Sequence, residues 1–224
     1  MEFGKAFVYQ FEDREWLKKL GIGALLLLIP LLGQLWIAGW SLEITKRVIR
    51  RDPQPLADWD DFGGYLVRGF LVLIIGFVYA LPIILVSACV SVLFPSAFDP
   101  SASNEVATSA WIVFACVNCM IILYSILLAL FIPAAVGNFA AKEQFGAAFR
   151  FGEVWGLVRA APGAYILVFL GTILTGFIAG LGVILCVIGV VITISYANSV
   201  MGNLMGQAYN VATAEQQLEP VEVV

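Results

Sequence analysis

The sequence contains no histidine, and this absence removes the commonest general base and a frequent ligand of metals and haem. No serine stands in the G-x-S-x-G pattern of a nucleophile elbow, and no glycine-rich phosphate loop follows a strand pattern. We therefore expect no catalytic residue and no bound cofactor, and we do not expect an enzyme.

Charged residues are also scarce, at 12% of the chain against about 25% in a typical soluble domain. They are clustered, which leaves four runs without any Asp, Glu, Lys or Arg, at residues 20–42, 69–98, 106–141 and 160–214. A helix needs roughly 20 apolar residues to cross a bilayer. The sequence therefore predicts an all-α integral membrane protein.

The last of these runs is too long for a single crossing. Its 55 residues would form a helix of roughly 80 Å, so we expect a turn at 180–182, where two glycines permit one. The expected apolar segments are then about 20–42, 67–95, 108–137, 162–180 and 183–208. They predict one transmembrane domain over 20–210, built as a bundle of about four full spans plus a first segment that is broken or re-entrant.

That first segment, 20–42, has two interpretations. A single crossing would place the N-terminus and its four basic residues on the opposite side from the other eight. A re-entrant hairpin bent at Pro30 and Gly33 would keep all twelve on one side, although its two short legs would need shielding by protein at membrane depth.

The two ends of the chain differ from its interior. Residues 1–19 are predicted to be an amphipathic interfacial segment, because Phe3, Phe7 and Phe11 recur at helical spacing. The alternative is an arm that packs on the protein's own loops. Residues 211–224 form an acidic tail, expected to be disordered or to bind a partner domain.

Basic residues predict the orientation. The regions 1–19, 43–68 and 142–159 carry all twelve Lys and Arg, whereas 99–105 and the tail carry none. Cytoplasmic loops are enriched in these residues, so we expect the amphipathic linkers 43–68 and 142–159 and the tail inside the cell, and 99–105 outside. The localisation predicted is a multi-pass protein of the inner or plasma membrane.

The linker after the first apolar segment contains Asp58-Trp59-Asp60-Asp61-Phe62. Asp58 is expected to cap a new helix, and the aromatic residues are expected to anchor the chain at the membrane interface. The candidate interface anchors are Trp59, Phe62 and, in the second linker, Trp155. A cation bound by the aspartates is the alternative.

Cysteine spacing offers one further pattern, Cys116-x-x-Cys119. It falls inside an expected span and has no histidine or other ligand to complete a zinc site. We interpret these residues as small packing side chains and expect no metal site.

Uncharged polar residues stand where a transporter would usually carry ionisable ones. The favoured interpretation is hydrogen bonding between helices. The alternative is a polar pathway along the last helix. The candidate intramembrane residues are Gln34, Asn118, Asn138, Asn198, Asn203 and Gln207.

Two Gly-x-x-x-Gly patterns occur in the last apolar run. Such pairs allow close approach of helices in membranes. We expect Gly176, Gly180, Gly202 and Gly206 to be helix-packing residues, either within the bundle or against a partner's helix.

Several motifs together resemble a known family. They are Gly21-x-Gly23, Ile29-Pro30, Gly39-Trp40, Tyr79-x-Leu81-Pro82, Ala148-Phe149-Arg150-Phe151, Gly206-x-x-Tyr209, and above all Pro55-Leu56-x-Asp58-Trp59-Asp60-Asp61 with Gly69. Over residues 15–210 they resemble the prokaryotic membrane family called domain of unknown function four-zero-one-three. Ala57 stands where members often have proline. The resemblance implies the architecture and no particular activity.

These observations lead to one preferred functional hypothesis and one alternative. The preferred hypothesis is a non-enzymatic structural or accessory subunit, or scaffold, that acts through protein or lipid contacts. The expected partners are the lipid bilayer and other membrane protein subunits or a second copy, with no nucleic acid because no long basic run occurs. The alternative is a small-solute transporter or channel that uses the polar residues of the last helices.

Overall fold

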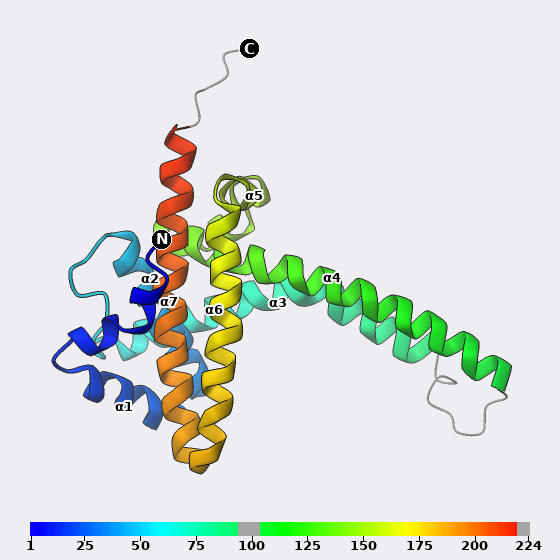
Figure 1. Ribbon diagram of the computed structural model, residues 1–224, viewed down its shortest axis with the longest axis horizontal. Coiled ribbons are helices and arrows are strands. Elements are labelled where there is room, and N and C mark those ends of the chain that lie inside the picture. Colours follow the sequence, from blue (N-terminus) through cyan, green and yellow to red (C-terminus); the bar gives the residue numbers. More distant parts are fainter. Residues whose placement is uncertain (94–103, 219–224) are drawn as a thin grey trace. The chain divides into compact units, whose positions relative to one another are not determined.

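The computed structural model describes residues 1–93 and 104–218, and within these ranges it contains helices and no strand. The prediction of an all-α membrane protein is confirmed. Figure 1 shows the elements, which are η1 Gly4–Phe7, η2 Tyr9–Glu12, α1 Trp16–Leu26, α2 Leu32–Ile49, α3 Phe62–Leu93, α4 Asn104–Lys142, η4 Phe145–Phe149, α5 Phe151–Ala160, α6 Pro162–Leu181, η5 Gly182–Leu185 and α7 Cys186–Leu218.

Four of the described helices are long and apolar enough to cross a membrane. Their spans are Phe62–Val90, Trp111–Lys142, Pro162–Ile184 and Ile188–Leu218. The chain reverses between the last two through the short helix η5, next to the expected glycine turn. The expected outer loop 99–105 lies largely outside the described residues.

The first apolar segment is broken. Helix α1 ends at Leu26 and α2 begins at Leu32, and the residues between them form turns around Pro30. The two helices contact each other and both contact α7. The structure therefore has the broken form of this segment and no continuous helix over 20–42.

The described chain forms two compact units. The first comprises Met1–Ile75 and Leu130–Val224, and the second comprises Gly76–Ala129. The second unit is a pair of helical segments from α3 and α4, in which the Tyr124 hydroxyl donates to the carbonyl oxygen of Tyr79 at 3.1 Å. Most of its described large apolar side chains are exposed, as expected for helices that face lipid.

Helix α7 is the centre of the first unit. It runs beside α6 (Figure 1) and also packs on α1, α2 and α5. The contact with α2 is close because Gly202 and Gly206 leave no side chain in the way. A Cβ at Gly202 would lie 2.5 Å from the Ser41 carbonyl oxygen, and one at Gly206 would lie 2.8 Å from that of Thr45.

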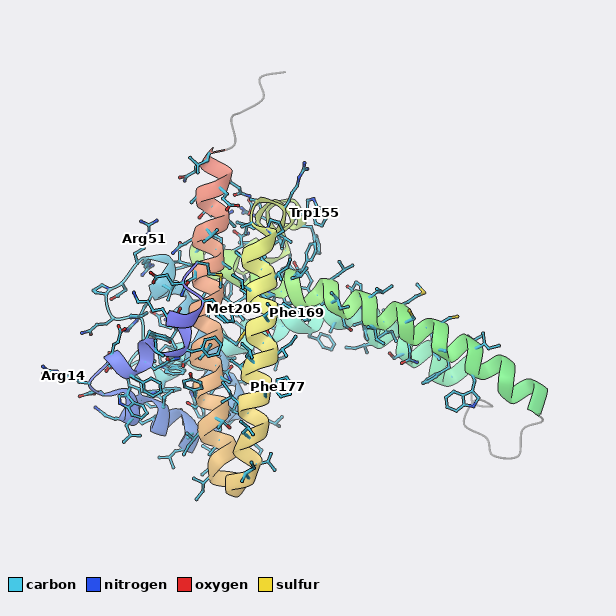
Figure 2. All side chains as sticks on the ribbon, in the orientation of Figure 1. Arg14, Arg51, Trp155, Phe169, Phe177 and Met205 are labelled. Atoms are coloured by element: carbon cyan, nitrogen blue, oxygen red, sulfur yellow. The ribbon has the colours of Figure 1, made fainter. Side chains whose placement is uncertain are left out.

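The other glycine pair has a different environment. A Cβ at Gly176 or Gly180 would meet nothing within 4 Å. Both glycines line a shallow groove on α6 with Ile173, Phe177 and Leu181, and Phe177 is exposed on its surface (Figure 2). Of the four candidate glycines, only Gly202 and Gly206 pack against another helix within the described residues.

The N-terminal segment differs from the expected amphipathic helix. It forms two 3-10 helices, and its buried side chains are Ala6, Tyr9 and Gln10. Phe11 is exposed, so the three phenylalanines do not share one buried face. The segment packs on α7.

Candidate functional site

A large polar cavity lies in the first unit, with a volume of about 1290 Å³. Its walls come from the N-terminal segment, from the linker between α2 and α3, and from the polar face of α7. Arg14 and Arg51 extend outward at its rim (Figure 2). The charged lining residues are Glu2, Lys5, Glu12, Asp13, Arg14, Glu15, Lys19, Arg51, Asp52 and Asp58, and α7 adds Asn203, Gln207 and Asn210.

The best-defined charge in this cavity belongs to Lys19. Its side chain is 7% exposed, and its Nζ lies 2.7 Å from Asp13 Oδ2 and 2.9 Å from Asp58 Oδ1. The same Nζ donates to the Leu56 carbonyl oxygen at 3.1 Å. A buried ammonium needs such partners to offset its lost hydration. Lys19 thereby joins the N-terminal segment to the α2–α3 linker.

The electrostatics of Asp13 follow from this pairing. Burial acts to raise its pKa, but the hydrogen bond and charge of Lys19, together with the Glu15 N–H, outweigh burial and lower it. Asp13 therefore carries its negative charge at neutral pH, where it balances Lys19.

Two tryptophans form a layer beneath the ion pairs. Trp40 and Trp59 stack with ring centroids 5.2 Å apart. Trp59 Nε1 donates to the Lys19 carbonyl oxygen at 2.8 Å, and Trp40 Nε1 donates to that of Ala57 at 2.9 Å. Trp59 is thus a buried core residue that fixes the linker, whereas the other two candidate anchors, Phe62 and Trp155, are exposed.

The acidic linker caps its helix with a different residue from the one predicted. Asp61 Oδ1 accepts from the Gly64 N–H at 2.9 Å, one turn into α3. Asp58 stands three residues earlier and pairs with Lys19 instead. The prediction that Asp58 is the helix cap is wrong, because Leu56, Ala57 and Trp59 are buried and hold residues 56–59 outside the helix.

The polar face of α7 is occupied by hydrogen bonds to the N-terminal part of the chain. Ser195 Oγ donates to the Leu20 carbonyl oxygen at 3.1 Å, and Gln10 Nε2 donates to Ser199 Oγ at 2.9 Å. Burial raises the pKa of the Tyr9 phenol, which stays protonated and donates to the Ser199 carbonyl oxygen. These serines therefore act in packing.

Asn203 and Gln207, two of the candidate intramembrane residues, stand in the cavity wall. Gln207 Nε2 donates to Asn203 Oδ1 at 2.6 Å, and Gln207 Oε1 accepts from the Glu2 N–H at 2.7 Å. The third candidate on this helix, Asn198, does not line the cavity; its Nδ2 donates to the Ile194 carbonyl oxygen of its own helix. The structure thus places only part of the expected polar row at one site.

The remaining candidate amides lie apart from the cavity. Gln34 is exposed near the start of α2. Asn118 donates to Phe114 of its own helix. Asn138 is buried and donates to the Ala147 carbonyl oxygen and to Glu153, each at 2.9 Å, so it holds the second linker against α4.

A second group of ion pairs connects the two linkers. Glu143 Oε1 lies 2.6 Å from both Lys46 Nζ and Arg50 Nη2. Glu153 of the second linker is surrounded by Lys142, Asn138 and Arg150, which lower its pKa to about 2. The basic residues at the ends of α2 and α4 are therefore partly neutralised within the first unit.

Within residues 1–93 and 104–218, no group of three or more His, Cys, Asp or Glu residues could hold a metal ion. Cys89, Cys116 and Cys119 are exposed free thiols. The cavity offers ion-pairing and hydrogen-bonding groups of both signs, which suit a polar or zwitterionic ligand.

Several residues of this site escaped sequence reasoning. Tyr9 and Gln10 carry no local pattern that predicts their burial, because their partner Ser199 lies 190 and 189 positions away in the sequence. Lys19 had a usable signal: it directly precedes 23 uncharged residues, a position where a charge needs a partner.

Comparison with known families agrees with the architecture. The family model described as protein of unknown function (DUF4013) matches residues 22–208. The chain belongs to this family. No curated protein matches the chain, and no solved structure matches it.

The matched region defines how much of the cavity belongs to the DUF4013 core. It includes the acidic linker with Asp58 and the α7 residues Asn203 and Gln207. Lys19 and the N-terminal segment precede it. In this DUF4013 protein, therefore, the cavity combines family positions with residues outside the matched region.

Proposed function

We propose that this chain is a non-catalytic membrane scaffold or accessory subunit that acts through protein and lipid contacts. Its membrane is the prokaryotic plasma membrane, and the charged linkers and C-terminal tail lie on the cytoplasmic side. The observation that carries the proposal is the state of α7, whose Ser195, Ser199 and Asn198 are hydrogen-bonded inside the protein. A helix with these groups engaged supports a packed body better than a polar pathway.

The contact surface of such a scaffold would be its charged side. The N-terminal segment is joined to the first linker through Lys19, and the first linker is joined to the second through Glu143. These ion pairs hold three separate segments in a fixed arrangement. Exposed charges remain on them, including Arg14, Arg51 and Asp60, and they favour a polar partner surface.

Site-specific photo-crosslinking tests this proposal. A photoreactive amino acid at Gln54 or Gln144, both exposed in the linkers, should trap a protein partner in intact cells. The same group at Leu181, exposed at the opposite end of α6, serves as the control and should trap lipid. Protein adducts absent from both linker positions would contradict the proposal.

The second candidate is a carrier or channel for a small solute, and the cavity favours it specifically. Asn203 and Gln207 line 1290 Å³ of polar space. Swelling of proteoliposomes in glycerol, and efflux of potassium, would detect such transport. If the chain transports a solute, the native protein should show flux. The Gln207→Leu variant should show none, although its melting temperature equals that of the native protein. If no flux is detected in the native protein, the scaffold remains favoured.

A further inference from the structure

The turn between α1 and α2 carries an exposed cluster of apolar side chains, here called the apolar tip and defined as residues 25–32. Leu25, Leu28, Ile29, Leu31 and Leu32 are all exposed, with Leu31 at 83%. No polar side chain occurs from Leu20 through Gly33. A patch of this kind needs an apolar environment to cover it.

Most backbone donors in the turn of the apolar tip are satisfied locally. The N–H groups of Leu27, Leu28 and Ile29 donate to carbonyl oxygens within residues 23–26, and that of Gly33 donates to Ile29. Pro30 has no N–H to satisfy. In hydrocarbon an unpaired backbone group costs several kcal/mol, whereas a turn in water has no such requirement.

One of these bonds is made through strain. Leu31 has φ 64° and ψ −58°, and the Leu32 N–H reaches the Pro30 carbonyl oxygen at 2.7 Å. This is a γ-turn with positive φ, a rare and strained conformation for a residue with a side chain. Relaxing the turn would break this hydrogen bond. In hydrocarbon no water could replace it, so a strained turn is less costly there than an unpaired N–H group.

Helices α1 and α2, which flank the apolar tip, are both held by the same polar segment, residues 56–58 of the α2–α3 linker. In the first turn of α1, Lys19 contacts Leu56 and Asp58. In α2, Trp40 donates to the Ala57 carbonyl oxygen. The uncharged part of α2 before Glu43 comprises only residues 32–42, roughly 17 Å of helix. This reaches about halfway through a hydrocarbon core of ~30 Å.

We propose that the apolar tip inserts into a single leaflet of the bilayer and that its ligands are the acyl chains of that leaflet. The segment enters and leaves on the side of the charged linkers. The N-terminus therefore lies on the same side as both linkers. A scaffold and a solute carrier could both insert the apolar tip in this way.

Depth-dependent quenching tests the insertion. The probe is an environment-sensitive fluorophore on Leu28→Cys, in a full-length chain whose four native cysteines are replaced by serine. Vesicles of phosphatidylcholine with doxyl groups on the acyl chains supply the lipid quencher, and iodide supplies the aqueous one. Gln54→Cys is the water-exposed control and Phe177→Cys the span control. We expect doxyl quenching at Leu28 to match that at Phe177 and to exceed that at Gln54 several-fold.

Sidedness is measured on the same cysteine-free background. An impermeant maleimide should label Glu12→Cys and Gln54→Cys from the same side of sealed vesicles, both positions being exposed. Labelling from opposite sides would show that residues 20–42 cross the bilayer and would overturn the proposal. Iodide quenching at Leu28, or shielding of Leu28 from both quenchers, would also overturn it, in favour of water or a protein covering.

Discussion

At the scale of single residues, the buried ammonium of Lys19 pairs with two aspartates, Asp13 and Asp58, whose removal should have different energetic costs. The side chain of Asp13 is 15% exposed and that of Asp58 is 49% exposed. Asp13→Asn should destabilise the protein by roughly 1–3 kcal/mol, because it leaves the buried ammonium with one remaining carboxylate partner. Asp58→Asn should cost less than about 1 kcal/mol, since the half-exposed carboxylate of Asp58 is screened by solvent.

The melting temperatures of the two variants in detergent, measured side by side at pH 7, check this ranking. Equal losses would mean that Lys19 does not distinguish its partners. Retained stability in both variants would remove the role assigned to this ion pair.

A second pair of residues concerns backbone conformation. Arg51 and Glu143 follow the C-terminal ends of α2 and α4, and both have positive φ, at 57° and 55°. Glycine adopts such a conformation without the steric cost of a Cβ. Arg51→Gly should therefore stabilise the protein by about 0.5–1 kcal/mol. Glu143→Gly should not, because it removes the carboxylate that joins Lys46 and Arg50.

Thermal unfolding of both variants distinguishes the two effects. A destabilised Arg51→Gly would indicate that the exposed guanidinium makes a contact whose loss exceeds the relieved strain.

Glu153 gives a pH prediction. Its pKa lies at about 2 in the folded protein against an ordinary value of 4.5. A depressed pKa contributes stability above the unfolded value, and that stability is lost as the pH falls through the folded value. We expect a loss between about pH 4.5 and pH 2 that Glu153→Gln reduces. A melting-temperature profile with the same slope in both proteins would contradict this.

At the scale of elements, two glycine pairs with the same sequence spacing have different packing environments. Gly202 faces the α2 backbone, whereas Gly176 faces open space. Gly202→Leu should destabilise the protein by roughly 1–3 kcal/mol or more, the usual cost of overpacking, because the nearest atom is the Ser41 carbonyl oxygen, which cannot rotate away. Gly176→Leu is the matched control and should leave the melting temperature within about 0.5 kcal/mol of the parent.

The two glycine variants can also be compared in native mass spectrometry. A stable Gly176→Leu protein that has lost a bound partner would show that the groove on α6 is an interface. Severe unfolding of Gly176→Leu would contradict the open environment of that helix face.

How far each element could be predicted depended on the range of the interactions involved. The four spans follow from runs without charge, which is a local property, and they were predicted. The burial of Trp59 depends on Trp40 and on the Lys19 carbonyl, so its local aromatic and acidic neighbours pointed to the interface instead. The sequence could not show that the two glycine pairs differ in packing, because the residues next to each pair do not indicate which helix lies opposite it.

At the scale of the whole molecule, the distribution of basic residues predicts which side of the membrane each loop faces. Single cysteines at Gln54 and Gln144 should react from the cytoplasmic side, because basic loops resist translocation. Positions 96 and 103, which lie outside the described residues, should react from the opposite side. Reaction of Gln54 from outside the cell would invert the proposed topology.

The hydrogen bonds between the N-terminal segment and α7 set an order for the biogenesis of the protein. Tyr9 and Ser199 are 190 positions apart. At the usual synthesis rate of about 5–20 residues per second, Tyr9 waits roughly 10–40 s before its partner exists. Throughout that interval the first residues of the chain have no α7 to dock on. The N-terminal segment can therefore take its place in the fold only after α7 has been synthesised.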